Sequence, residues 1–355
     1  MVPVPVLPIL AASALCSFAL AALLLVAGVG SRPLAAHLAF AFGIMPLILG
    51  AMSYFIPVLT RGPSSPLASG LPPLLAAIGG GLALLAFHGG FGVTPLAAAT
   101  IGLVAALALA AWAAFRVRAM VGRRHPGLDW YFAALGFLVA ALIAVALMEL
   151  FPAYRAAWRQ FHLHANLLGF VGLTALGTLQ VLLPTCMGQV DPEAFQRLRR
   201  DLKWAASGTA LVAAGSGLVS LGTPGSGAAA VIGALLWQLV VLRMAFGWWQ
   251  RYRRAMLAVD SAAASLGAAA VGLCGLLLAG ILHGGGLLNG RAAIVAFVVG
   301  FLLPLVSGAA AYLLPVWIRP GAQGEWHRGL RARLCRRSGW RAAAFLAVGA
   351  LLVLG

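Results

Sequence analysis

Residues 159–170 read RQFHLHANLLGF, and the chain stays apolar from there to Pro184. A run of this length is enough for a helix that crosses the hydrocarbon core of a bilayer. It places His162 and His164 close to the start of that helix. Residues two apart on a helix project roughly 200° from one another, so the two imidazoles face different partners. Ionisable groups inside a membrane are rare and mostly functional, and imidazole is a common metal ligand, so we predict that this pair carries the protein's chemistry.

Composition extends this prediction to the whole chain. Its 355 residues are 63% hydrophobic and only 9% charged, which excludes an ordinary soluble domain and predicts an all-α, multi-pass membrane protein with a single membrane domain, residues 1–355. The first apolar run is too long for a signal peptide and lacks a charged region before it, so we expect a retained span. Eleven runs are long enough to cross a membrane: 5–29, 33–58, 67–89, 94–117, 129–151, 158–184, 203–222, 225–249, 260–284, 291–317 and 339–355.

The basic residues are unevenly divided between the two sides. If the spans alternate in direction, all but four of the 24 Lys and Arg residues fall on one side, the exceptions being Arg32, Arg155, Arg159 and Arg291. Cytoplasmic loops carry an excess of Lys and Arg, so we predict a cytoplasmic amino terminus in the inner (plasma) membrane. The same rule accounts for the net charge of +17, and nucleic-acid binding is therefore not expected.

Three segments share one spacing of landmark residues. The landmarks are His37, Gly50 and Pro57; His164, Gly177 and Pro184; and Val295, Gly308 and Pro315. Glycine and proline are frequent in membrane helices, but three copies in register with the span count favour an internal repeat. We predict eleven or twelve helices in three pseudo-symmetric four-helix arcs, with spans 2, 6 and 10 innermost. The repeat units would cover about 1–125, 126–257 and 258–355, the last one short of a helix.

Most of the histidines are expected at one depth. With the amino terminus inside, spans 2 and 6 enter the membrane from the outer face. Three histidines then lie within about one and a half helical turns of that face: His37, His162 and His164. His88 and His283 close two other spans on the same side, and an ordinary helix-end position is the simpler interpretation for both. Two more histidines fall in cytoplasmic loops and are interpreted as solvated residues, His125 and His327.

A haem between helices fits this layer of histidines. A porphyrin buries a large apolar disc and takes axial nitrogens from facing sides. The repeat pairs His37 with His164, so we predict these two as axial ligands and leave His162 for a second group. Glycines that would let a porphyrin approach the helix backbones are Gly43, Gly169 and Gly172.

Charged residues near the histidine pair leave two interpretations open. Arg155 and Arg159 stand a turn or so before the pair and are candidates to bind haem propionates, although a plain surface position is an equally good interpretation. Glu149 at the end of span 5 is interpreted as an interfacial carboxylate that could pair with Arg155. The acidic residues nearly all flank spans, so we do not expect proton pumping through carboxylates inside the membrane.

The sequence resembles the catalytic subunit of haem-copper oxidases, above all the C-type oxidases and their nitric-oxide reductase relatives. The family pattern H-x-H-x4-G-[WF]-x6-G-x6-P is matched at each position by His162, His164, Gly169, Phe170, Gly177 and Pro184. The resemblance implies twelve helices in three arcs, a low-spin haem b on His164 and His37, and a high-spin haem on His162. The segment from His37 to Gly62 is similar to the haem- and copper-binding NnrS-like membrane proteins.

The sequence also departs from the oxidase pattern. The H-x-H helix falls in the second arc, whereas in the oxidases it belongs to the third. The copper-binding histidines of the oxidases have no counterpart. A copper centre needs three imidazoles, and only His88 and His283 are left to supply them.

Two classes of function remain open at this stage. The first is a haem-b-binding membrane protein, an oxidoreductase if it is an enzyme, which transfers electrons or handles nitric oxide or dioxygen with a cytochrome or quinol as electron donor. In this class we also consider an oxidase subunit whose partners supply the missing ligands. The alternative is a non-catalytic transporter, sensor or cofactor-assembly protein that keeps the oxidase-like scaffold. Membrane lipid is the one partner that both classes require.

Overall fold

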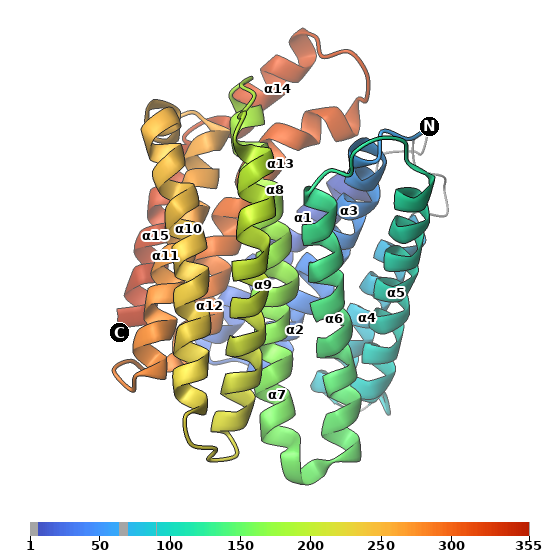
Figure 1. Cartoon of the computed structure of the whole chain (residues 1–355), viewed down its shortest axis with the longest axis vertical. Helices are drawn as coiled ribbons and strands as arrows, with labels where there is room; N and C mark the ends of the chain where they lie inside the picture. Colours follow the sequence, from blue (N-terminus) through green and yellow to red (C-terminus); the bar gives the residue numbers. More distant parts are fainter. Residues whose placement is uncertain (1–5, 64–69, 90, 355) are drawn as a thin grey trace.

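The computed structural model describes residues 6–63, 70–89 and 91–354, in which every regular element is a helix (Figure 1). The helices run side by side as one bundle. In chain order they are α1 Val6–Ala27, α2 Arg32–His37, η1 Leu38–Ile44, α3 Met45–Leu59, α4 Leu71–His88, α5 Pro95–Ala119, α6 Gly127–Leu150, η3 Pro152–Tyr154, α7 Arg155–His164, η4 Ala165–Gly172, α8 Leu173–Cys186, α9 Ala194–Val219, α10 Ser226–Met256, α11 Ala262–Gly284, η5 Gly290–Ala292, α12 Ala293–Phe297, η6 Val298–Leu302, α13 Leu303–Ile318, α14 Glu325–Cys335 and α15 Ser338–Leu354.

Ten helical segments in the described part of the chain are long and apolar enough to cross a membrane, which defines a multi-pass membrane protein. They correspond to ten of the eleven predicted spans. The remaining prediction, 203–222, falls in α9, which is not among the ten. This helix begins nine residues earlier, at Ala194, and its first part is highly charged, although it packs alongside α10 in the bundle.

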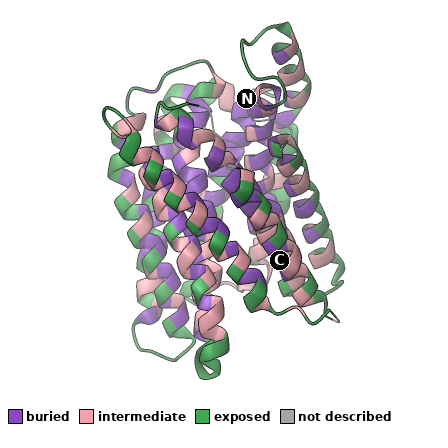
Figure 2. Cartoon of the chain, turned by 90° about the vertical axis from the view of Figure 1, so that its right-hand side faces the viewer, coloured by how far each residue is buried: buried purple, intermediate pink, exposed green. Residues whose placement is uncertain are grey.

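Three continuous helices form the interior of the bundle, as the repeat predicts. They are α2–η1–α3, α7–η4–α8 and α12–η6–α13, and between 61 and 83% of the most apolar stretch of each is buried, against 39% or less in the other seven spans. Figure 2 shows this buried interior. Each of the three contains a π-helical segment, η1, η4 or η6, and a proline in its last turns, Pro57, Pro184 or Pro315. π-Helical turns are rare and often occur at functional sites.

The inner helices also pack in one repeated register. A Cβ atom added at each landmark glycine would come within 3 Å of a side chain on a neighbouring helix, and the pairs are Gly50 with Leu10, Gly177 with Trp130 and Gly308 with Ser265. The neighbouring helices are α1, α6 and α11, and each makes a second contact with the inner helix seven residues further along its own sequence. These second pairs are Ser17 with Gly43, Phe137 with Gly169 and Gly272 with Gly300. The pairing of each inner helix with the helix before it is therefore the same three times. The division of the chain into three complete four-helix units stays a prediction.

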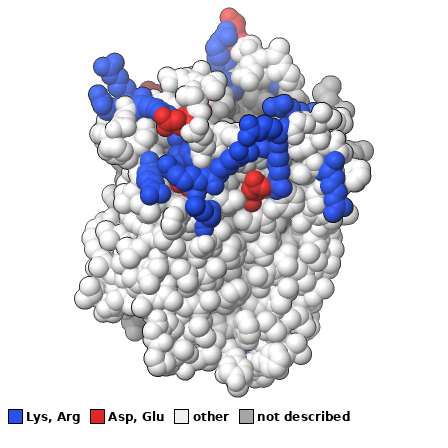
Figure 3. Space-filling model, in the orientation of Figure 1, with Lys and Arg blue, Asp and Glu red and all other residues white. Residues whose placement is uncertain are grey.

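The two ends of the bundle differ in charge. Figure 3 shows Lys and Arg gathered at the end where Figure 1 places the amino terminus. The histidine layer described below lies toward the opposite end, where α4 and α11 finish and α7 begins. The separation of charge agrees with loops that alternate between two sides of a membrane.

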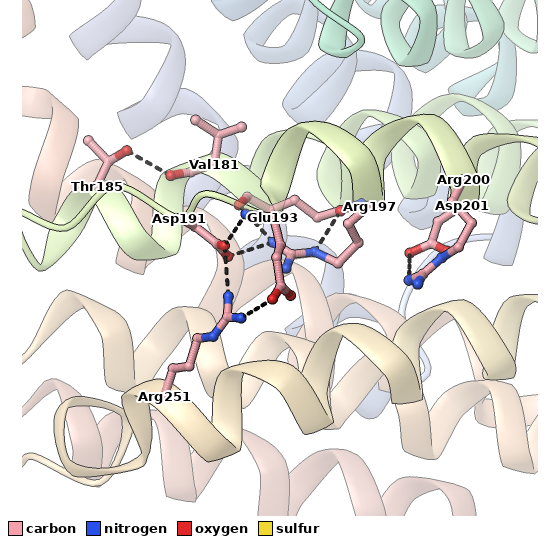
Figure 4. Close-up of polar contacts among 9 residues, drawn as sticks. Val181, Thr185, Asp191, Glu193, Arg197, Arg200, Asp201 and Arg251 are labelled. Atoms are coloured by element: carbon pink, nitrogen blue, oxygen red, sulfur yellow. Dashed lines mark hydrogen bonds and ion pairs between the residues drawn. The ribbon is translucent and has the colours of Figure 1, made fainter.

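A buried ion-pair cluster ties three helices together at the basic end (Figure 4). Asp191, whose side chain is 1% exposed, accepts hydrogen bonds of 2.9 Å from both Arg197 and Arg251. Arg197 also donates through Nε to Gln180 Oε1 at 3.0 Å, and Arg251 pairs with Glu193. The cluster thereby links α8 and α9 to α10.

We expect Arg197→Met to destabilise the protein by about 3 kcal/mol, because removing the buried cation of an ion pair leaves Asp191 with only the partly exposed Arg251 as partner. Asp191 and the Gln180 amide would both lose a partner. Thermal unfolding of the detergent-solubilised protein measures the effect. The matched control is Arg199→Met on the same helix, an exposed residue over the Phe195 ring that should cost less than about 0.5 kcal/mol. Equal losses in the two variants would contradict a special role for the cluster.

Candidate metal-binding site

The structure brings His37 and His162 together near one end of the bundle. His37 is the last residue of α2, and His162 lies in the last turn of α7, so the pair joins two of the inner helices. The ring centroids are 6.3 Å apart and the ring planes differ by 20°. This separation is too wide for direct contact between the rings. A metal bound by one nitrogen of each ring, with metal–nitrogen bonds of roughly 2 Å, would hold two imidazoles at a similar separation.

Both rings are held by hydrogen bonds from Nδ1 to backbone carbonyls. His37 Nδ1 lies 2.7 Å from the carbonyl oxygen of Pro33, and His162 Nδ1 lies 2.8 Å from that of Ala141 on α6. A carbonyl oxygen can only accept, so each Nδ1 carries the proton and each Nε2 keeps its lone pair. Metal-binding histidines are oriented in the same way.

Two further side chains contact the pair. Asn166 lies one turn after His162, and its Nδ2 donates to the His162 carbonyl oxygen at 2.8 Å while remaining 3.4 Å from Nε2. At 3.4 Å this second hydrogen bond is long and weak, so a ligand on Nε2 would have to displace only a weak donor. The ring of Phe87, on α4, lies 4.4 Å from the ring of His37 and covers one side of it.

The structure places His37 beside His162 and His164 beside Ser216, and the pairing of His37 with His164 on one haem stays a prediction. His164 Nδ1 lies 2.9 Å from both the carbonyl oxygen of Gln160 and Oγ of Ser216 on α9. The reason follows from the repeat itself. In a threefold arrangement, side chains at equivalent positions of the inner helices point in equivalent directions. Each of the two histidines therefore contacts the outer helix of its own repeat unit, and they do not contact each other. His37 contacts Phe87 on α4, and His164 contacts Ser216 on α9.

The two weaker ligand candidates lie apart from the pair. His88 is exposed at the end of α4, with its ring 6.0 Å from that of Phe91. His283, at the end of α11, is exposed and directs Nδ1 to the carbonyl oxygen of Leu288 at 2.8 Å. In the described part of the chain no group of three or more His, Cys, Asp or Glu side chains is arranged to hold a metal ion. His37 and His162 are therefore brought together without a third such side chain among the described residues.

The predicted propionate partners lie at the surface. Arg155 pairs with Glu149 at 3.2 Å, and both side chains are about half exposed, so the interfacial pairing considered for Glu149 is present. Arg159 is exposed on α7, one turn after Arg155. Closer to the pair, Trp158 lies one turn before His162 on the same face of α7, and its indole nitrogen is buried without a hydrogen-bond partner among the described residues. An unused donor of this kind suits an acceptor on a bound group.

The three glycine positions near the histidines are filled by neighbouring helices and do not admit a porphyrin to the helix backbone there, contrary to the prediction. A Cβ atom at Gly169 would lie 2.5 Å from Cβ of Phe137, and one at Gly43 would lie 3.0 Å from Cβ of Ser17. Gly172 likewise faces the Trp237 ring at 3.1 Å. Neighbouring helices fill these positions, so the glycines serve close helix packing.

The two loop histidines have structural roles. His327 was expected to be solvated but is buried: its Nε2 lies 2.8 Å from the carbonyl oxygen of Arg319, and its Nδ1 accepts from the amide of Gly324. His125 is half-buried and accepts from the amide of Gly127 at the start of α6. Burial, together with the nearby Arg61, lowers the pKa of His125.

An apolar cavity lies away from the histidines, between α3, α8 and α13. Its volume is about 100 Å³, and its lining includes Met52, Thr178, Leu313 and Trp317. No histidine lines it. The cavity is thus a separate feature from the histidine pair.

Several contacts of the site have no signal in the sequence. The carbonyl of Ala141 and the hydroxyl of Ser216 come from distant helices, and neither residue type marks a ligand support. Asn166 and Trp158 could have been found, because each lies four residues from His162 and therefore on its face of the helix.

These observations define an all-helical, multi-pass membrane protein with two facing imidazoles between inner helices. No protein-family model matches the chain, and no curated protein matches it either. The function must therefore be argued from the site.

Proposed function

We propose that this protein binds haem b between His37 and His162, as a divergent relative of the haem-copper oxidases, and that it transfers electrons or handles a diatomic gas such as nitric oxide or dioxygen. The observation that carries the proposal is the 6.3 Å separation of two imidazoles whose Nδ1 atoms are both bound to backbone carbonyls. A bound haem supplies a one-electron redox centre.

The residues present fit such a group. His37 and His162 would hold the group through their imidazole nitrogens, and their 6.3 Å centroid separation leaves space for one metal ion. The unpaired indole nitrogen of Trp158 supplies a buried donor on the same helix face as His162. Arg159 remains a candidate partner for a propionate, while Arg155 is already paired with Glu149.

The chain's own contribution is to orient the ligands before anything binds. The carbonyls of Pro33 and Ala141 fix the tautomer and rotation of the two rings, and Phe87 shields His37 from one side. Since the rings need not reorient, little rotamer entropy is lost on binding. Hydrogen bonds to Nδ1 also raise the basicity of Nε2, which strengthens it as a ligand.

The orientation in the membrane is part of the same proposal. With the basic end in the cytoplasm, the amino terminus is cytoplasmic and the histidine pair lies toward the outer face of the inner membrane. An electron donor, a cytochrome or a quinol, would then reach the site from the outer face or from the bilayer. His164 lies beside Ser216 on α9 and is left as the candidate ligand of a second group.

The test is the visible spectrum of the full chain purified from haem-replete cells. We expect a sharp α-band on reduction and close to one haem b for each chain. A colourless protein would contradict the proposal and favour a transporter, sensor or assembly protein on the same scaffold. Metal analysis of the same sample reports copper independently.

A further inference from the structure

The helix α14 and the turns that flank it carry an unusual density of uncompensated positive charge. Seven arginines occur between residues 319 and 341, with Glu325 as the only acidic residue in that interval: Arg319, Arg328, Arg331, Arg333, Arg336, Arg337 and Arg341. None of the seven forms an ion pair within the described residues. At other places on the same end, Asp191 and Asp201 do neutralise neighbouring arginines. The described residues therefore provide no anionic partner for the arginines of this segment.

The segment is a built surface and not a loose tail. His327 anchors the start of α14 through its bond to the Arg319 carbonyl, and Arg319 lies over the Trp326 ring at 4.2 Å. Arg341 donates to two carbonyls at the end of α14, and the amide of Arg337 donates to Asp260 at 2.5 Å. The guanidinium groups are thus presented from a fixed backbone.

One arginine shows an unused donor. Arg331 donates through Nε to the Tyr312 carbonyl at 3.2 Å and lies over the Tyr312 ring at 4.4 Å. A second nitrogen of the same guanidinium, NH2, is buried and has no hydrogen-bond partner among the described residues. A buried charged donor without a partner is costly unless a bound group supplies the acceptor.

The position of the surface identifies the kind of anion. The α14 helix lies at the basic end of the bundle, between α13 and α15, which belong to two of the membrane-spanning segments (Figure 1). Trp340, at the start of α15, is 68% exposed, as suits an indole at the boundary of a bilayer. Clusters of arginine directly beside a membrane span attract anionic lipid headgroups.

We propose that α14 and its flanking arginines bind the phosphate headgroups of anionic phospholipids in the leaflet at the basic end. The exposed side chains of Arg328, Arg333, Arg336 and Arg337 would attract the headgroups, and the unused nitrogen of Arg331 would bind a phosphate oxygen. This inference does not depend on haem binding.

The test compares lipid binding to the detergent-solubilised full chain by native mass spectrometry and by the shift in unfolding temperature. Phosphatidylglycerol should bind more tightly than phosphatidylcholine of the same chain length. Replacing Arg328, Arg333, Arg336 and Arg337 together with glutamine should weaken phosphatidylglycerol binding at least roughly tenfold, since each basic residue near a membrane surface contributes roughly fivefold. Lysine at the same four positions should restore most of the affinity, which separates loss of charge from loss of folding.

The matched control replaces four exposed arginines of other loops at the same end with glutamine, namely Arg118, Arg123, Arg253 and Arg254. It should keep binding within roughly threefold, because headgroup attraction falls off with distance from the charges. Equal losses in the two quadruple variants would overturn the proposal, as would equal binding of both lipids. Inorganic phosphate that competed as well as phosphatidylglycerol would assign the surface to a soluble anion instead.

Discussion

His162→Ala is expected to remove haem from the purified protein, and His37→Ala to do the same. Each substitution deletes one of the two imidazoles whose centroids lie 6.3 Å apart, and a single remaining imidazole would hold the group poorly. Losing a supporting residue around a metal ligand already costs 10–100-fold in affinity, so losing the ligand should cost at least roughly tenfold. The readout is the ratio of haem to protein after size-exclusion chromatography.

The matched control is His164→Ala, two residues from His162 on the same helix. In the structure this side chain leans on Ser216 and takes no part in the pair, so the haem on His37 and His162 should remain. The pairing inferred from the repeat alone makes the opposite prediction: loss of haem with His164→Ala and retention with His162→Ala. If the low-spin haem is lost in His164→Ala and kept in His162→Ala, the pairing derived from the structure is contradicted.

Gly272→Ala is expected to destabilise the bundle by about 3 kcal/mol or to prevent its assembly. A Cβ atom at this position would lie 1.9 Å from the carbonyl oxygen of Gly300 in η6, so α11 and the third inner helix would have to separate. Overpacking of a well-packed interior costs 1–3 kcal/mol, and here the clash is with backbone, which cannot rotate away. Thermal unfolding in detergent and the yield of folded protein measure the effect.

A second glycine of α11 provides the control. Gly280 has no neighbouring atom within 4 Å of an added Cβ, so Gly280→Ala should be neutral or stabilising by up to about 1 kcal/mol through better helix propensity. Similar losses in the two variants would mean that the close contact of Gly272 with η6 is not the cause of the loss.

The helical architecture could be predicted because it depends on local sequence. Apolar run length located ten of the spans, and the spacing of Gly50, Gly177 and Gly308 identified the three inner helices. Run length is a reliable signal because each span must satisfy its own backbone hydrogen bonds in the bilayer and therefore forms a continuous helix. Span 203–222 lies in α9, which begins before it with a charged stretch that supplies Arg197 to the ion-pair cluster around Asp191.

The pairing of the histidines could not be predicted, because it depends on how whole helices are rotated against each other. Sequence spacing correctly indicated that His162 and His164 face different partners, but not which of them faces His37. The supports of the site come from carbonyls such as that of Ala141, which any residue could provide. The π-helical turns after His37 and His164 also lack a local sequence signal. They nevertheless change the direction in which the following side chains project from the helix.

The most direct test of the haem site is the electron paramagnetic resonance spectrum of the ferric protein, grown with ¹⁵N-labelled histidine. Two axial imidazoles impose a low-spin state, so we predict a low-spin signal with hyperfine coupling to two histidine nitrogens. In His162→Ala that signal should disappear, and added imidazole should restore it. A high-spin ferric signal in the unmodified protein, or a low-spin signal that survives in His162→Ala, would contradict haem ligation by His37 and His162.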